Sequence, residues 1–129
     1  MAGRIAVAIV EDNAVFREAL EILLALEPDI DVTVAAESGS EAVEACRARP
    51  PDVVLVDYRL PDLDGVETTR ALREACPAAV VLALTAAAGA AEVDALLAAG
   101  AVRSLRKDDR LDQIVAAIRE AAGGRAAAR

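Results

Sequence analysis

Residues 52–65 read Asp-Val-Val-Leu-Val-Asp-Tyr-Arg-Leu-Pro-Asp-Leu-Asp-Gly. The apolar run at residues 53–56 is short, β-branched and uninterrupted by charge, which is typical of a strand buried on both faces of a sheet. Asp57 follows it directly, before a loop that Pro61 and Gly65 mark. An ionisable side chain at this point lies at the carboxyl edge of a parallel sheet, where open α/β folds place their chemistry. The alternative is a surface aspartate in a turn.

Similar apolar segments recur along the chain and alternate with helical patterns. The predicted strands are residues 5–10, 32–36, 53–57, 80–85 and 102–106. The first four helices are expected to end at Pro28, Pro50, Pro77 and Gly100, and the fifth at Ala122. Asn13 or Asp12 can cap the first helix. Five strands alternating with five helices predict an α/β fold, in which helices cover both faces of a parallel sheet.

Length and composition restrict the class of protein. The 129 residues fit one domain, predicted at residues 4–122, and residues 123–129 are interpreted as a tail or the start of a linker. With 56% hydrophobic residues the chain is too apolar to be disordered. Its formal charge of −8 argues against a domain that binds nucleic acid by itself. The absence of histidine removes histidine-based catalysis and most zinc sites.

Cysteine spacing and hydropathy bear on the compartment. Cys46 and Cys76 lie in helical patterns and lack CxxC spacing, so we expect buried, reduced thiols. The first residues lead straight into a strand without a signal-peptide layout. No apolar run approaches the ~20 residues needed to span a bilayer. These features predict a cytoplasmic protein with no membrane partner.

Polar side chains gather where the predicted strands end. Glu11 and Asp12 follow the first strand, Asp57 the third, Thr85 the fourth and Lys107 the fifth. In a parallel sheet these ends lie at one edge. Three carboxylates placed together repel one another unless a cation intervenes, and a hard divalent cation such as Mg²⁺ prefers oxygen ligands.

The same set suits phosphoryl transfer. A hydroxyl and an ammonium opposite the acids could hold the oxygens of a phosphoryl group, with positioning and charge stabilisation as the main means of catalysis. A carboxylate is a competent nucleophile for this reaction and would form an acyl phosphate. Taken singly, Lys107 could be a solvated charge at a turn, and Thr85 an ordinary β-branched residue at a strand end.

The chain resembles the response-regulator receiver domain of two-component signalling over essentially its whole length. The resemblance rests on residues that occur in order at the strand ends. They are Glu11-Asp12, Asp57 with Pro61 and Gly65, Thr85-Ala86, and Lys107. It implies a flavodoxin-like, receiver-type fold: a five-stranded parallel sheet in the order 2-1-3-4-5 with helices on both faces.

The resemblance also implies roles for these residues. Asp57 would be the phosphoacceptor. Asp12 and Asp57 would bind Mg²⁺ together with the backbone carbonyl of Arg59, and Glu11 would act directly or through water. Thr85 would move toward the phosphoryl group and bind it through its hydroxyl. The ammonium of Lys107 would pair with a phosphoryl oxygen.

The implied partners are those of a phosphorylation switch. A histidine kinase or a small phosphodonor would supply the phosphoryl group. Phosphorylation would then act on the face formed by the fourth helix, fifth strand and fifth helix, or on a homodimer surface at the first and fifth helices. Transcription would be controlled through an output domain outside this chain, which would supply any contact with DNA.

Several positions depart from the usual receiver pattern. Ser104 stands where receivers commonly carry an aromatic residue that turns inward when the threonine moves. Asp108 follows Lys107 in place of a common proline, which favours the branch joined to helix-turn-helix output domains. Arg59 and Ala87 occupy positions at which the family tunes phosphoryl lifetime.

Three other functions share some of these sequence features. A receiver fold that binds partners without phosphorylation is slightly favoured by Ser104 and disfavoured by the complete acidic site. A phosphatase of the haloacid-dehalogenase type expects Asp-x-Asp at the nucleophile and usually a cap domain, whereas this chain has Asp57-Tyr58-Arg59. Nucleotide or flavin binding lacks its glycine-rich loop.

Overall fold

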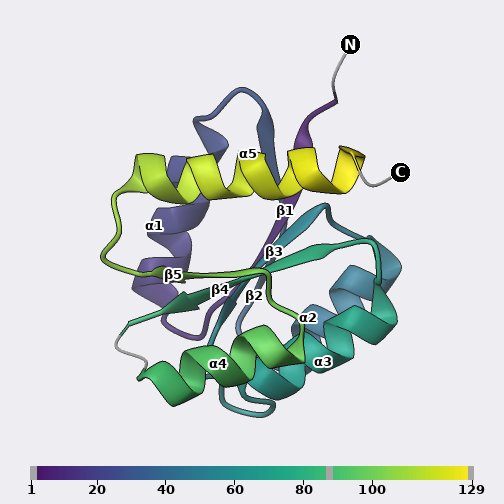
Figure 1. The fold of residues 1–129 in the computed structure, drawn as a ribbon. Coiled ribbons are helices and arrows are strands. Elements are labelled where there is room, and N and C mark those ends of the chain that lie inside the picture. Colours follow the sequence, from purple (N-terminus) through teal and green to yellow (C-terminus); the bar gives the residue numbers. More distant parts are fainter. Residues whose placement is uncertain (1–2, 87–88, 128–129) are drawn as a thin grey trace.

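The computed structural model describes residues 3–86 and 89–127, with side chains as far as residue 123. Strands and helices alternate throughout, as the sequence predicts. In chain order the elements are β1 (Ile5–Val10), α1 (Ala14–Ala25), β2 (Ile30–Ala36), α2 (Gly39–Ala48), β3 (Val53–Asp57), α3 (Gly65–Ala75), β4 (Val80–Thr85), α4 (Ala90–Ala99), β5 (Arg103–Arg106) and α5 (Leu111–Ala127). Figure 1 shows the strands as a central layer between two layers of helices.

The five strands form one parallel sheet in the order β2-β1-β3-β4-β5. This order confirms the one implied by the resemblance. β3 lies in the middle and is buried along its whole length, because strands flank both of its edges and helices cover both of its faces. Its last residue, Asp57, therefore emerges at the centre of the carboxyl edge.

Alternate residues of β1, β3 and β4 supply two separate cores. On β3, Val53 and Leu55 pack with the apolar stripes of α1 and α5. Val54 and Val56 pack on the opposite face with α2, α3 and α4. Figure 1 shows the same division, with α1 and α5 on one side of the sheet and the other three helices on the other. The strand period of two thus decides which helices each side chain meets.

Local signals start and end the helices next to the site. Asn13 caps α1 by accepting the backbone N–H of Phe16 at 3.0 Å, as expected. Gly100 ends α4 with a φ of 126°, a conformation that favours glycine. A Cβ on Gly65 would lie 2.6 Å from the carbonyl oxygen of Asp57, so only glycine allows α3 to start this close to β3. Gly65 therefore shapes the loop beyond Asp57, in line with the sequence analysis.

Some element boundaries differ from the prediction. β2 starts at Ile30 rather than at Val32, because the buried Ile30 side chain faces the core and the residue pairs with Ile5 of β1. α5 continues to Ala127 although the apolar pattern stops at Ala122. This extension contains two glycines, which disfavour helical backbone, beside an arginine and two alanines, which favour it, so neither periodicity nor propensity sets the end of this helix.

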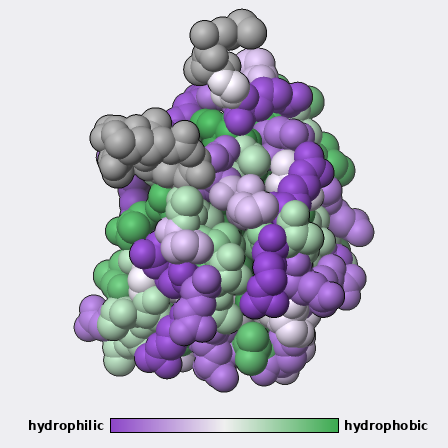
Figure 2. Space-filling view, turned by 90° about the vertical axis from the view of Figure 1, so that its right-hand side faces the viewer, coloured by the Kyte–Doolittle hydropathy of each residue, from purple (hydrophilic) through white to green (hydrophobic). Residues whose placement is uncertain are grey.

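The molecular surface is mixed in character. Figure 2 views the molecule from the right-hand side of Figure 1 and shows hydrophilic and hydrophobic residues interspersed. The larger exposed apolar side chains lie mainly on α1 and at its C-cap, where Val15, Ile22, Leu23 and Leu26 face solvent. In the part of the chain that the structure describes, every helix is too short or too polar to cross a bilayer.

Candidate functional site

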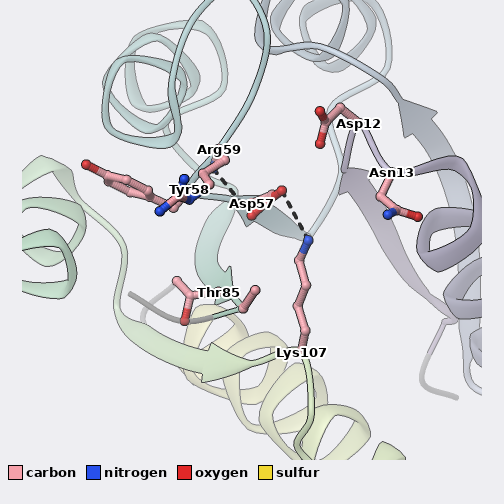
Figure 3. A pocket seen from close by; sticks show the side chains of 8 residues that line it. Asp12, Asn13, Asp57, Tyr58, Arg59, Thr85 and Lys107 are labelled. Carbon is pink, nitrogen blue, oxygen red and sulfur yellow. Dashed lines mark hydrogen bonds and ion pairs between the residues drawn. The ribbon is translucent and has the colours of Figure 1, made fainter. Parts of the chain in front are cut away.

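A pocket of about 300 Å³ opens at the carboxyl edge of the sheet. Its lining brings together side chains from the ends of β1, β3, β4 and β5 (Figure 3). The lining residues are Asp12, Asn13, Asp57, Tyr58, Arg59, Thr85, Ala86 and Lys107. The pocket thus contains five of the six site residues that the sequence predicts. The sixth, Glu11, is fully buried at the end of β1, against Lys107.

Lys107 is the positive centre of the site. Its ammonium pairs with Glu11. It also lies 3.2 Å from Asp57 Oδ2 (Figure 3). Burial lowers the pKa of Lys107, but the Glu11 and Asp57 carboxylates outweigh burial and raise it. The Phe16 ring, whose centroid is 5.1 Å from the ammonium, adds a cation–π contact. Lys107 is therefore held as a cation, directed at both acids.

Glu11 is the most deeply buried of the three acids at the site. Burial raises its pKa to about 7, against the opposing effects of the Lys107 ammonium and the Asn13 N–H, and the nearby Asp57 adds to the rise. The Asn13 N–H donates to Glu11 Oε2 at 3.0 Å, so this carboxylate is held by the β1–α1 loop as well as by Lys107. An added cation would favour its ionised form.

The donor atoms fit a hard divalent cation. Glu11, Asp12 and Asp57 each offer a carboxylate oxygen, and these oxygens lie within 4.8 Å of one another. Oxygen donors of this kind suit Mg²⁺, which typically retains several waters beside one or two carboxylates. Asp12 is exposed whereas the other two are buried, which leaves one side of the cluster open to the pocket.

Thr85 points away from Asp57 in this structure. Its buried hydroxyl donates to the Leu105 carbonyl on β5 at 3.4 Å, and its own carbonyl accepts the Lys107 N–H at 2.7 Å. The residue therefore joins β4 to β5 beside the pocket. Ser104, which replaces the usual aromatic residue, pairs with Ala83 of β4 and is half-buried. The predicted tuning position Ala87 lies outside the described residues.

Arg17 lies beside the site, although its position in the sequence predicted no role for it. This buried guanidinium on α1 donates to the Glu11 carbonyl at 2.8 Å and lies 3.5 Å from the Glu37 carboxylate. It anchors the end of β1 from which Glu11 and Asp12 project. Its spacing in the sequence could have indicated that Arg17 is buried, because it lies on the apolar stripe of α1 with Leu20 and Leu24.

Comparisons with known proteins agree with this geometry. The family model of the response regulator receiver domain matches residues 7–119. The transcriptional regulatory protein DegU of Brevibacillus brevis is 35% identical over 122 residues, which cover 95% of this chain and 52% of DegU. A protein-glutamate methylesterase/protein-glutamine glutaminase of Syntrophus aciditrophicus is 41% identical over 106 residues, covering 80% of this chain and 30% of the relative.

A solved structure shows the same architecture. The signal receiver domain of NarL from Mycobacterium tuberculosis is 34% identical and superposes with a TM-score of 0.89, covering 95% of this chain and 99% of that domain. The chain spans about half the length of the first curated relatives that it matches. The match over residues 7–119, the sheet order and the site at the strand ends together establish that this chain belongs to the response regulator receiver domain family.

Proposed function

We propose that Asp57 accepts a phosphoryl group from a histidine kinase in a reaction that requires Mg²⁺. One observation carries the proposal: the Asp57 carboxylate lines the pocket with a lysine ammonium 3.2 Å away and two further carboxylates within 4.8 Å. This arrangement combines a nucleophile, a fixed positive charge and a cation-binding set. It suits phosphoryl transfer, in which catalysis consists largely of positioning and charge stabilisation.

The chain's own groups would divide the work. An Asp57 oxygen attacks phosphorus, the bond from phosphorus to the donor's nitrogen or oxygen breaks, and the donor leaves with that electron pair. The Arg59 N–H, 3.4 Å from Asp57 Oδ1, helps to orient the carboxylate. The Lys107 ammonium, now paired with Glu11 and Asp57, would bind an oxygen of the incoming phosphoryl group.

Glu11, Asp12 and Asp57 are the residues that would hold Mg²⁺, with the backbone carbonyl of Arg59 as a further ligand and Glu11 acting directly or through water. Bound Mg²⁺ would offset negative charge on the phosphoryl oxygens. The fit of the oxygen donors supports this assignment. The Thr85 hydroxyl would exchange its 3.4 Å contact with the Leu105 carbonyl for the phosphoryl group.

We further propose that phosphorylation controls an output domain outside this chain. DegU is a transcriptional regulator about twice as long as the segment matched here, which supports transcription control as the output. The charge of −8 makes DNA contact more suitable for the output domain than for the receiver. A histidine kinase, and a second copy at the first and fifth helices, are the proposed protein partners. The free, buried cysteines fit a reducing cytoplasm.

The decisive experiment is intact-mass spectrometry after incubation with acetyl phosphate and Mg²⁺. We expect one added phosphoryl group on the wild type, none on Asp57→Asn, and none on the wild type in EDTA. Asp94→Asn is the matched control, because it removes an exposed aspartate on α4 away from the pocket and should be phosphorylated normally. An unmodified wild type, or a phosphorylated Asp57→Asn protein, would contradict the proposal.

Ser104 favours a second candidate function, a receiver fold that binds its partner without phosphorylation. A half-buried serine on β5 offers no aromatic side chain to couple with Thr85. The test is partner capture by wild type and Asp57→Asn with and without acetyl phosphate. Equal capture in all four samples would support this candidate, whereas capture that depends on Asp57 would support the phosphorylation switch.

A further inference from the structure

The loop between β3 and α3, residues 58–64, is tied to the start of α2 by one side chain. Asp62 accepts the backbone N–H of Gly39 at 3.0 Å, that of Ser40 at 3.3 Å, and the Ser40 hydroxyl. Asp62 Oδ1 also accepts the backbone N–H of Leu63, in its own loop, at 2.6 Å. The contacts with Gly39 and Ser40 join positions more than twenty residues apart, at the start of α2 and just before the start of α3, two helices that pack side by side (Figure 1).

The carboxylate is well suited to this contact. The Ser40 hydroxyl and the Leu63 N–H, with the N–H groups of Ser40 and Gly39, lower the pKa of Asp62 to about 2. It therefore remains charged at neutral pH, and hydrogen bonds to an ionised acceptor are stronger than those between neutral groups. A negative charge at a helix N-terminus is also favourable.

Capping alone does not account for Asp62. Ser38 already caps α2, with its hydroxyl oxygen accepting the Glu41 N–H at 3.3 Å. The loop also lies directly on the helix end, since a Cβ on Gly39 would be 2.8 Å from Leu63 Cβ and 3.1 Å from the Leu63 carbonyl oxygen. Asp62 differs from Ser38 in one respect: it attaches the loop to α2.

The loop's other described hydrogen bonds are local. The Gly65 N–H donates to the Tyr58 carbonyl at 2.7 Å, and the Thr68 hydroxyl donates to the Leu63 carbonyl at 3.2 Å. The Arg59 N–H faces Asp57 Oδ1 at 3.4 Å. These bonds link the loop to β3, to α3 or to itself, and none of them reaches α2. Among the described residues, Asp62 supplies the hydrogen bonds that join this loop to α2.

We propose that Asp62 is a positioning residue for the metal site, which clamps the β3–α3 loop to α2 and thereby fixes the Arg59 carbonyl at the pocket. This inference rests on the proposed function, in which that carbonyl is a Mg²⁺ ligand. Mg²⁺ demands near-ideal octahedral geometry, so a loosened ligand costs affinity. Partners that orient metal ligands typically change affinity by about 10–100-fold when removed. We expect the lower end here, because a single ligand of the set is affected.

The test compares Asp62→Ala with Ser38→Ala. Both variants remove an oxygen that caps α2, but only the first releases the loop. Calorimetric titration with MgCl₂ should show about tenfold weaker binding to Asp62→Ala and unchanged binding to Ser38→Ala. In EDTA, amide hydrogen exchange should be faster at Arg59 and Gly65 in Asp62→Ala alone. Asp62→Asn retains one oxygen acceptor, so it should recover part of the affinity and provides a milder variant if Asp62→Ala fails to fold.

The outcomes separate this inference from the proposed function. Selective loss of Mg²⁺ affinity and faster loop exchange in Asp62→Ala would support the clamp. Wild-type affinity in Asp62→Ala and Asp62→Asn, or an equal loss in Ser38→Ala, would overturn it while leaving the metal site itself intact. A wild type that binds no Mg²⁺ would overturn the proposed metal site and, with it, this role of Asp62.

Discussion

Glu11→Gln should remove a pH dependence from the stability of the metal-free protein. Burial raises the pKa of Glu11 from an ordinary value of 4.5 to about 7, so the folded protein holds a proton that the unfolded chain has already released. Stability from such a group is complete below pH 4.5 and is lost as pH rises through about 7. At about 1.4 kcal/mol per pH unit, the loss is roughly 3 kcal/mol. Glutamine does not titrate, so the variant lacks this pH-dependent contribution to stability.

The assay is urea unfolding in EDTA, followed by circular dichroism across this pH range. The free energy of unfolding of the wild type minus that of Glu11→Gln should fall by roughly 3 kcal/mol between pH 4.5 and 7, then level off. Lys107 adds no titration in this window, because the two carboxylates raise its pKa. The ion pair between Lys107 and Glu11 forms only as Glu11 ionises, so its effect is already contained in the pKa of about 7.

Glu44→Gln is the matched control, because it removes one negative charge from an exposed position on α2. Any pH dependence that it shares with Glu11→Gln is a general effect of charge and is subtracted. A difference curve for Glu11→Gln that is flat or rises with pH would refute the reasoning. It would mean that Glu11 is ionised in the folded protein well below neutral pH, with Lys107 outweighing burial.

Three further predictions concern packing and the thiols. Gly65→Ala should destabilise the fold by about 1–3 kcal/mol in urea unfolding, because the added Cβ would meet the Asp57 backbone. Gly123→Ala is the control, because its Cβ would lie in open space on α5 and should stabilise the fold by about 0.5–1 kcal/mol. Equal effects of the two substitutions would contradict the clash at Gly65. Leu55→Ala should cost about 2–5 kcal/mol by the same assay, since Leu55 is fully buried, and a cost below 1 kcal/mol would show that the core collapses around the cavity. Cys46 should react with Ellman's reagent only as fast as the protein opens, because burial and the neighbouring Cys76 raise its pKa to about 12, and rapid native-state labelling would rule this out.

Periodicity sufficed for most of the fold because each strand of a covered parallel sheet is apolar along its length. Residues 80–85 were predicted with the bounds that the structure has, and the third strand with its end at Asp57. The site followed from the same information, since the ends of parallel strands share an edge and three of these ends carry Glu11 with Asp12, Asp57, and Lys107. The sheet order came from the family resemblance, because strand pairing joins residues that no local pattern relates.

Local sequence thus determined the elements, the burial of β3 and the kinds of side chain at the strand ends. Tertiary structure decided which of those groups meet. It buried Arg17 under the Glu11 carbonyl, turned the Thr85 hydroxyl toward Leu105, and joined Asp62 to the start of α2. The physical reason is that these contacts depend on how layers pack and on side-chain rotamers, and two of them join residues twenty or more apart. Helix and strand patterns depend instead on neighbours a few residues away.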